Sequence, residues 1–243
     1  MQDAGRAQTF YAADVSITVA AIRRYPVKSM GGEALQRVEL DMRGLVGDRR
    51  YAVVDGQGKL SSGKDSRRFR RRDEVFSYAA ATGADGRVEV RRNGSGWYAG
   101  DADLDSELSR AFGDQVRVLA EDDVPYFDDG PVSLVGTASL EWCRRELGVD
   151  ADPRRTRTNL VLETTEPFEE ETWAGRTLEI GSVTLAVDRR LERCRMVDLA
   201  QDGVATTTPM LKALGQSRDV CLAMLADVTV PGQVQVGDVV TVR

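Results

Sequence analysis

The feature that most constrains the fold is a series of short apolar segments, each broken after a few residues by Gly, Asp, Asn or Pro. Short runs rich in Val, Ile, Leu and Tyr between such breaks are typical of β-strands. They cover residues 15–25, 34–40, 49–55, 75–81, 87–92, 115–119, 132–135, 159–163, 176–181, 183–188, 220–228 and 239–243. Because strands this numerous pair mostly through short turns, the sequence predicts a mainly β, mostly antiparallel protein with barrel or sandwich closure.

Two segments interrupt this pattern with helical spacing. Leu140, Cys143 and Leu147 recur three or four residues apart, between a possible N-cap at Thr137 and a C-terminal Gly148, which predicts a helix over 138–147. A second short helix is predicted around residues 209–214, where proline stands at a permitted early position. Few helices are therefore expected.

The chain divides at a polar, proline-containing join. Residues 1–14 show no periodicity and are predicted to form a loose tail, followed by a β-rich region at 15–120 and a second region at 121–243. A net charge of −6 argues against nucleic acid as a partner. No apolar run is long enough to span a membrane and no secretory leader is recognisable, so we expect a cytoplasmic protein.

The absence of histidine excludes many chemistries. Among its 243 residues the chain has no His and three Cys, none in a CxxC pair. Catalytic triads, His-ligated metals, disulfide frameworks and iron–sulfur clusters are thus excluded. Any chemistry must depend on carboxylates, Arg, Lys, Tyr, Cys or a cofactor.

Two clusters in the first region could bind an anion. Lys28 and Ser29 follow a strand in YPVKSMGG and offer an ammonium group, a hydroxyl and approachable backbone N–H groups. Arg49 stands at the start of the strand in GLVGDRRYAVVD. Taken singly, each is better explained without a ligand: Lys28 by a hairpin exit with a solvated lysine, and Arg49 by a charged pair at a strand start. The basic run at 67–72 is interpreted as a solvated loop or a contact to an anionic substrate.

Two further clusters lie in the second region. Gly136 and Thr137 open the helix predicted over 138–147, where free N–H groups suit a phosphate or a simple cap. Arg157 and Asn159 alternate with threonines that we expect to face outward on a strand over 155–163. An Arg and an amide so spaced could contact the edge of a flat heterocycle, although a solvated edge strand explains them too.

Cys194 is the strongest chemical candidate. It lies between Arg193 and Arg195 in a polar stretch, and two guanidinium charges favour the thiolate form that binds soft metals or attacks electrophiles. Cys143 and Cys221 stand in apolar settings and are interpreted as packing residues.

In their order and spacing, these clusters resemble the MOSC family, named for the C-terminal domain of molybdenum cofactor sulfurases, and in particular its two-part members related to amidoxime-reducing proteins. The resemblance runs from about residue 15 to the end. The matching stretches are YPVKS, GLVGDRRY, VSLVGTASL, TRTNLVLE, PFEEETW, LEIGSVTLAV, ERCRMVDLAQDG and VPGQVQVGDVVTV. The resemblance implies an N-terminal β-barrel-like domain at 15–120 and a MOSC-type β-barrel at 121–243.

The resemblance also implies a cofactor, a molybdenum held by a molybdopterin dithiolene, with Cys194 as the metal ligand and a catalytic residue. The residues expected to hold the rest of the cofactor are Lys28, Ser29, Arg49, Gly136, Thr137, Arg157, Asn159 and Arg193. Asp198 is expected to act as a catalytic proton carrier near the metal.

The function implied is an oxidoreductase that reduces N-hydroxylated or N-oxide small molecules by two-electron oxygen transfer. Because the chain has no flavin or Fe–S motif, the electrons are expected from a separate flavin or Fe–S reductase. Two alternatives remain open: a sulfur carrier with a persulfide on Cys194, and a binding module that takes an anionic ligand without catalysis.

Overall fold

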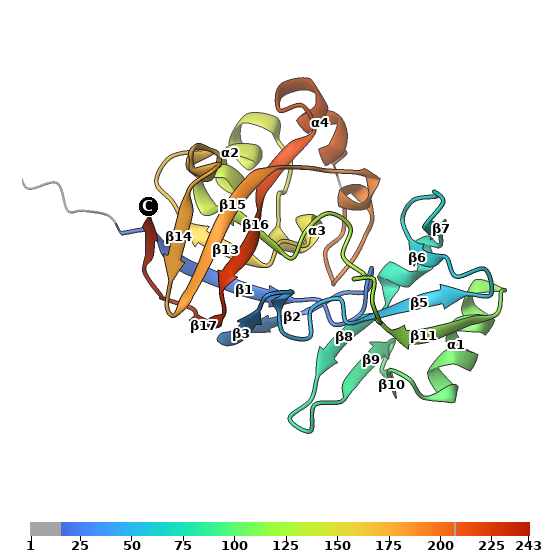
Figure 1. Ribbon diagram of the computed structural model, residues 1–243. Helices are drawn as coiled ribbons and strands as arrows, with labels where there is room; N and C mark the ends of the chain where they lie inside the picture. Colours follow the sequence, from blue (N-terminus) through green and yellow to red (C-terminus); the bar gives the residue numbers. More distant parts are fainter. Residues whose placement is uncertain (1–15, 207) are drawn as a thin grey trace, which may run out of the picture.

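The computed structural model describes residues 16–206 and 208–243, so the loose tail predicted at 1–14 lies outside the described residues. These residues form a mainly β structure with four sheets and few helices, which confirms the predicted fold class. Two bodies are visible in Figure 1: a larger one around the main sheet and a smaller one around β5 and β11. No described helix is both long enough and apolar enough to cross a membrane.

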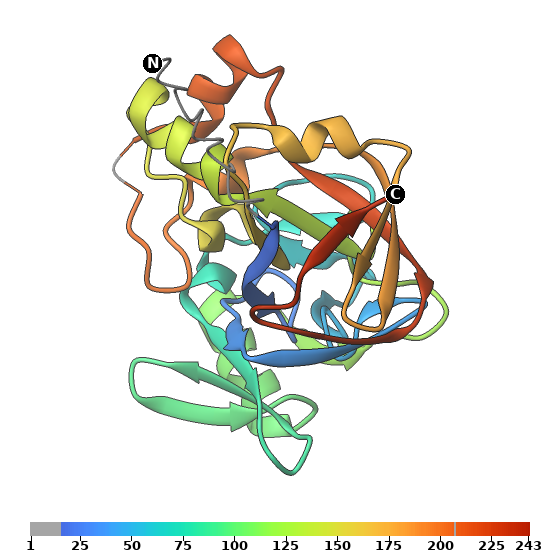
Figure 2. The ribbon, with the colours of Figure 1, turned by 90° about the vertical axis from the view of Figure 1, so that its left-hand side faces the viewer.

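An eight-stranded sheet forms the larger body. Its strands are β1 (Thr18–Arg24), β2 (Glu33–Leu35), β12 (Val132–Gly136), β13 (Leu160–Glu163), β14 (Thr177–Ile180), β15 (Val183–Glu192), β16 (Cys221–Val230) and β18 (Val240–Val242). Their order is β18-β14-β15-β16-β12-β13-β1-β2, and β12 and β13 alone among these neighbours run parallel. A small sheet of β17 (Gly232–Gln235), β3 (Arg37–Asp41) and β4 (Gly44–Leu45) packs on the same core (Figure 2).

Strand β16 shows why an apolar run forms the centre of this sheet. Its first six residues, 221–226, are all buried. Met224 and Ala226 belong to the core shared with β3 and β17, whereas Leu222 belongs to a second core beneath the helices. Because both faces are covered, the strand does not alternate between apolar and polar residues.

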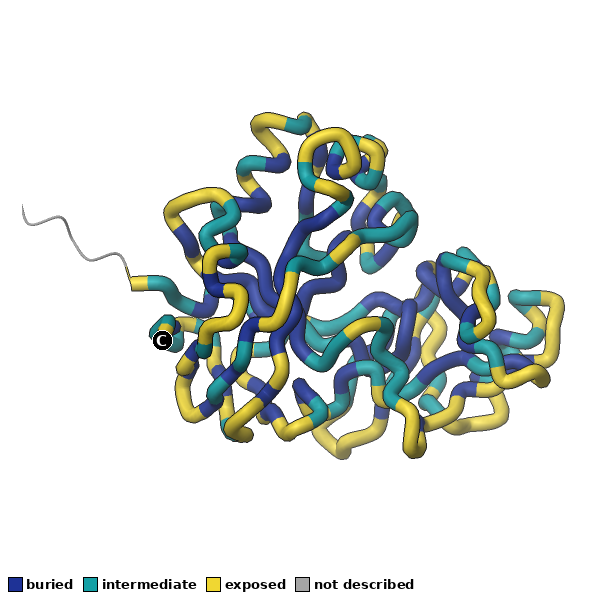
Figure 3. Tube along the Cα trace, turned by 45° about the horizontal axis from the view of Figure 1, so that its top comes forward, coloured by how far each residue is buried: buried dark blue, intermediate teal, exposed yellow. Residues whose placement is uncertain are grey.

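The smaller body has a core of its own. The elements of this body are β5 (Tyr51–Asp55), β6 (Leu60–Ser62), β7 (Phe69–Arg71), β8 (Ala79–Thr82), β9 (Val88–Arg92), β10 (Ser95–Tyr98), β11 (Val116–Ala120), η1 (Asp73–Ser77) and α1 (Ala102–Phe112). Leu104 and Leu108 of α1 are fully buried against Val53, Val90 and Val118. In Figure 3 the buried positions follow the strands of both bodies, and exposed positions gather in the connections.

The remaining helices cover the larger body. They are α2 (Thr137–Leu147), α3 (Pro153–Thr156), η2 (Glu169–Trp173), η3 (Arg195–Asp198) and α4 (Met210–Ser217). The two predicted helices are therefore confirmed, and Gly148 ends α2 in the left-handed conformation with φ 64°. The N-cap position of α2 is Gly136, however, because the Thr137 side chain bonds Thr164 instead.

Three local predictions were wrong. Helix α1 was not predicted, although Leu104 and Leu108 have helical spacing and Gly113 ends the helix with φ 64°. Residues 75–81 begin in η1 and become a strand only at Ala79. The strand expected over 155–163 begins at Leu160, because α3 and a left-handed Arg157 (φ 54°) precede it.

Strand β1 joins the two regions of the sequence. It lies between β2 and β13 in the main sheet, with Ile22 opposite Leu160. The loop that follows β1 reaches the smaller body, where Lys28 N donates to Tyr51 O at 2.8 Å. Side chains of the 25–31 loop therefore lie where the two bodies meet.

Candidate functional site

One pocket contains most of the predicted site residues. Lys28, Ser29, Arg49, Arg157, Asn159, Arg193 and Cys194 all line it. It also contains Lys64, Arg155 and Met196, which sequence reasoning did not assign. Six of its lining residues are basic, and three, Asp128, Asp129 and Glu192, are acidic. The pocket therefore favours an anionic ligand.

The loop after β1 supplies Lys28 and Ser29. Ser29 has φ 69°, and this left-handed residue turns the chain so that its hydroxyl donates to Ser61 O at 3.1 Å. Both side chains are almost fully buried. Burial lowers the pKa of Lys28 to about 8, even though Asp128 beside it acts in the opposite direction.

Asp128 bridges two lysines at this end of the pocket. Its Oδ1 accepts from Lys28 and its Oδ2 accepts from Lys64 at 3.0 Å. Burial alone would raise the pKa of Asp128, but the charges of Lys28 and Lys64 outweigh it and hold the pKa well below the usual range. This residue comes from the 121–131 join, for which the sequence predicts only a connection.

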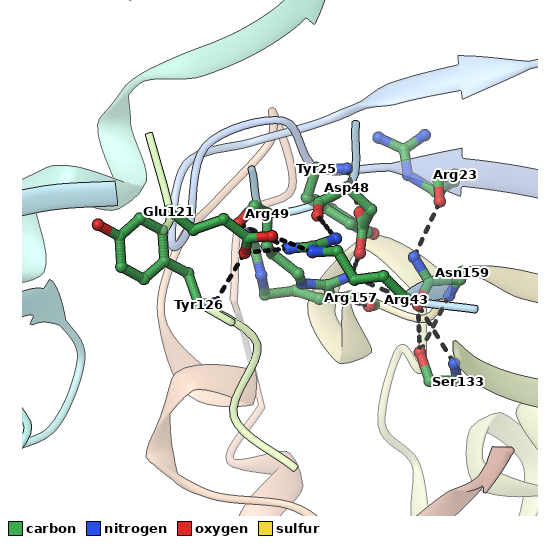
Figure 4. Close-up of polar contacts among 10 residues, drawn as sticks. All are labelled: Arg23, Tyr25, Arg43, Asp48, Arg49, Glu121, Tyr126, Ser133, Arg157 and Asn159. Atoms are coloured by element: carbon green, nitrogen blue, oxygen red, sulfur yellow. Dashed lines mark hydrogen bonds and ion pairs between the residues drawn. The ribbon is translucent and has the colours of Figure 1, made fainter. Parts of the chain in front are cut away.

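Arg49 and Arg157 stack around one tyrosine. Their guanidinium carbons lie 4.8 Å and 4.3 Å from the centre of the Tyr25 ring. Arg49 pairs with Asp48 and donates to Arg157 O at 2.9 Å, so it also holds the left-handed turn before β13 (Figure 4). No sequence signal predicts the stack, because Tyr25 shows only strand character there.

Arg157 retains free hydrogen-bonding capacity. Its Nη1 donates to Gln201 Oε1 at 3.4 Å, while its buried Nη2 has no partner among the described residues. Burial, followed by the charge of Arg49, lowers the pKa of Arg157 to about 10, so the side chain is still charged at neutral pH. A buried donor without a partner is costly, and a ligand acceptor would satisfy it.

Asn159 holds strands together. Its Oδ1 accepts from Ser133 N at 3.2 Å and Ser133 Oγ at 3.0 Å, and its Nδ2 donates to Arg23 O at 3.3 Å (Figure 4). It thus connects β1, β12 and the start of β13. The neighbouring Thr156 and Thr158 are buried and bond each other at 2.7 Å, so the expectation that these threonines face outward was wrong.

Cys194 lies at the end of β15 and precedes η3. Its side chain is partly accessible, unlike the buried Cys143 and Cys221, which confirms the packing interpretation of those two. Burial raises the pKa of Cys143 to about 11.

The two arginines beside Cys194 differ. Arg193 lines the pocket, donates to Thr156 O and has a buried Nε with no partner in the described part of the chain. Burial lowers its pKa to about 10. Arg195 instead pairs with Asp73 at 2.7 Å and donates to Gly63 O in the smaller body.

Three predicted site residues are not among those lining the pocket. Asp198 accepts from Met210 N at 2.7 Å and Leu211 N at 3.3 Å and so caps α4. Gly136 and Thr137 lie at the start of α2, where a buried carboxylate is already present. Glu170 Oε2 accepts from Ser139 Oγ at 2.9 Å.

The start of α2 is also closely packed. A Cβ atom at Gly136 would lie 2.5 Å from Thr164 Oγ1 and 2.7 Å from Glu170 Oε2. The structure therefore separates Gly136 and Thr137 from the other predicted cofactor contacts.

The basic run 67–72 is largely paired within the protein. Arg70 and Arg72 face Asp55, Arg71 pairs with Asp73, and Arg68 donates to Pro125 O and Phe127 O. These contacts attach β7 to its neighbours and to the 121–131 join.

Two chain segments match known families. The family model described as "MOSC N-terminal beta barrel domain" matches residues 16–111, and the one described as "MOSC domain" matches residues 108–241.

A relative and a solved structure extend the comparison. The chain is 24% identical over 204 residues to a molybdenum cofactor sulfurase of Caenorhabditis briggsae; the match covers 74% of the chain and 29% of that longer protein. It resembles the crystal structure of the YuaD protein from Bacillus subtilis with a TM-score of 0.53 and 13% identity, over 93% of this chain and 95% of that one, which shows a shared fold. With both family models matched in this order along it, the chain belongs to the MOSC domain family.

Proposed function

We propose that the pocket binds the molybdenum cofactor and that Cys194 is its protein ligand to the metal. The observation that carries the proposal is that Cys194 lines the same pocket as Lys28, Arg49 and Arg157, which come from distant parts of the sequence. A thiol, several cations and few acids are what a metal dithiolene with a phosphate tail requires.

The donor set fits such a group. Arg157 Nη2 and Arg193 Nε are buried donors without a partner in the residues described. Both guanidiniums remain charged at neutral pH and can bind anionic or carbonyl oxygens of a ligand. Ser29 donates its hydroxyl proton to Ser61 O, which leaves the hydroxyl oxygen free to accept. The predicted contacts of Gly136 and Thr137 remain predictions without support from this geometry.

With the cofactor bound, we further propose that the protein is an oxidoreductase that reduces N-hydroxylated or N-oxide compounds. The cofactor would supply two-electron redox chemistry at the metal. The protein would fix the metal through Cys194, neutralise the anionic tail with Lys28 and Arg49, and orient the ring system with Arg157 and Arg193. A separate flavin or Fe–S protein is proposed as the electron donor.

The proton-carrier role of Asp198 also remains a prediction. Its carboxylate is engaged by two backbone N–H groups of α4 and faces Arg155 Nη2 at 3.4 Å. These contacts give Asp198 a role in positioning α4 against η3.

The test is molybdenum content per chain, measured by elemental analysis on protein from a host able to make the cofactor. Wild type is expected to contain about one molybdenum per chain, and Cys194→Ser close to none. Cys221→Ser is the matched control, because Cys221 is buried in β16 and does not line the pocket. Wild-type protein without molybdenum would contradict the proposal.

The second candidate is a sulfur carrier with a persulfide on Cys194. It is favoured by the similarity to a molybdenum cofactor sulfurase, although this chain spans less than a third of that protein. Mass spectrometry separates the two. The carrier would show one additional sulfur atom on Cys194 without bound molybdenum, whereas the oxidoreductase would contain molybdenum and reduce an N-hydroxylated amidine with a chemical electron donor.

A further inference from the structure

Lys28 is an unusual pocket residue because its ammonium group is buried yet faces few groups of opposite charge. The charged groups that act on it most strongly are Asp128, Arg49 and Lys64, of which Asp128 alone is negative. The Phe69 ring lies 5.0 Å from its Nζ. Burying an ammonium group is costly unless a partner compensates it. Asp128 is therefore what makes a charged Lys28 tolerable in the pocket without a ligand.

The carboxylate of Asp128 comes from a loop whose neighbouring residues are fixed. Tyr126 N donates to Glu121 Oε2 at 3.1 Å, and Arg43 pairs with the same Glu121 (Figure 4). Arg68 Nη1 donates to Phe127 O at 3.4 Å. Asp128 and Asp129 both line the pocket, but among the described residues Asp128 is the one whose carboxylate contacts lysines.

We propose that Asp128 is a resident counterion: a positioning residue that holds Lys28 charged in the pocket and gives up both lysines to an anionic group of the ligand. This proposal depends on the proposed function in one respect only, namely that the ligand is anionic. The two oxygens of Asp128, each on a different ammonium group, occupy the place that two oxygens of a phosphate would take.

Removing the carboxylate has two opposing effects. Asp128→Asn removes the carboxylate that competes with an anion for both lysines. Anion binding should therefore strengthen as long as Lys28 stays protonated. It also removes the negative charge that raises the pKa of Lys28, so this pKa falls below about 8 and the ammonium loses its proton at lower pH. The variant should therefore bind anions more tightly in acid, and lose that advantage as the pH rises.

The first measurement follows the lysines directly. The chain has only four, Lys28, Lys59, Lys64 and Lys212. After reductive methylation with a ¹³C label, NMR gives one titrating signal for each lysine and one for the α-amino group, and Lys28→Arg assigns the Lys28 signal. In Asp128→Asn the midpoint for Lys28 is expected to fall, and saturating sulfate should raise it again.

The second measurement is sulfate binding by calorimetry at constant ionic strength. Sulfate stays dianionic over the whole range, so a pH dependence reports on the protein. At pH 6 we expect Asp128→Asn to bind sulfate roughly tenfold more tightly than wild type. By pH 8.5 this difference should be gone.

Asp129→Asn is the matched control, since it removes the same charge from the same wall of the pocket. It should leave the midpoint of Lys28 and the shape of the pH profile as in wild type. Circular dichroism checks that each variant is folded. An unchanged Lys28 midpoint in Asp128→Asn, or the same profile in both variants, would overturn the proposal.

The outcomes also separate this inference from the proposed function. Sulfate binding to none of the three proteins overturns the resident counterion, yet leaves Cys194 to be judged on molybdenum content. Conversely, protein without molybdenum that still shows the expected lysine titration keeps the counterion and removes the cofactor.

Discussion

Two places in this protein offer hydrogen-bond donors to an anion. In one place these donors are already bonded within the protein, and in the other some of them are free. At the start of α2, Ala138 N already donates to Thr164 Oγ1 at 3.2 Å, the buried carboxyl group of Glu170 accepts from Ser139 Oγ, and there is no room for even one added carbon at Gly136. In the pocket, Arg157 and Arg193 each keep a buried donor without a partner in the described residues. A helix start or an Arg pair in a sequence marks donors, but only the fold decides whether an internal acceptor takes them.

The largest expected effect concerns the unpaired buried donors of the pocket. Arg157→Met should weaken binding of pterin-6-carboxylate, an anionic fluorescent heterocycle, roughly 10- to 100-fold, because a charged buried donor to the ligand is lost. Methionine can adopt the left-handed backbone at this position about as readily as arginine. Removing a buried charge that has no ion-pair partner in the described part of the chain should leave the melting temperature equal or higher.

Arg155→Met is the control for that experiment. Arg155 is also buried, but it donates to Val197 O at 2.9 Å and Thr208 O at 3.0 Å, so its loss should lower the melting temperature. Equal loss of stability in both variants would mean that Arg157, too, is mainly structural.

The next largest effect concerns the closely packed start of α2. Gly136→Ala places a Cβ against Thr164 Oγ1 and Glu170 Oε2, and should cost about 2 kcal/mol of unfolding free energy in denaturant titrations. Binding of pterin-6-carboxylate to the folded fraction should not change. Weaker ligand binding with unchanged stability would place Gly136 in the binding site after all.

The smallest effect concerns Glu170 itself. Burial raises its pKa, so folding favours the protonated acid, and the stability from this group is lost as pH rises from the ordinary pKa of a glutamate through the folded value. Glu170→Gln should therefore flatten the fall in stability across this range. An unchanged pH slope in thermal unfolding would show that Glu170 is not the group responsible.

How far the sequence predicts the site depends on backbone regularity. Lys28 and Ser29 lie in the loop after β1, and such a position is readable from the pattern of apolar segments. Cys194 is indicated instead by the two arginines beside it in the sequence. Arg157 follows a four-residue helix and adopts a left-handed conformation. The alternation of Arg and Thr in the sequence predicts a strand there instead. Arg157 does line the pocket with the other predicted residues, but the prediction of a strand at this position was wrong.

The other misses arise from tertiary contacts. Asp128 lies in the 121–131 join and pairs with Lys28, a hundred positions earlier in the chain, and no local pattern predicts that pairing. Arg195 looked equivalent to Arg193 in sequence, yet it pairs with Asp73 in the smaller body. Helix α1 is different, because its leucine spacing and its glycine end were present in the sequence and could have been used.

The position of β1 has a consequence for how the chain is made. Thr18 pairs with Glu163, so the first strand of the main sheet leaves the ribosome long before its partner β13 exists. At usual synthesis rates that interval is on the order of ten seconds. The smaller body, whose strands are nearly contiguous, can form during the wait, and β1 must stay soluble beside it until the rest of the sheet arrives.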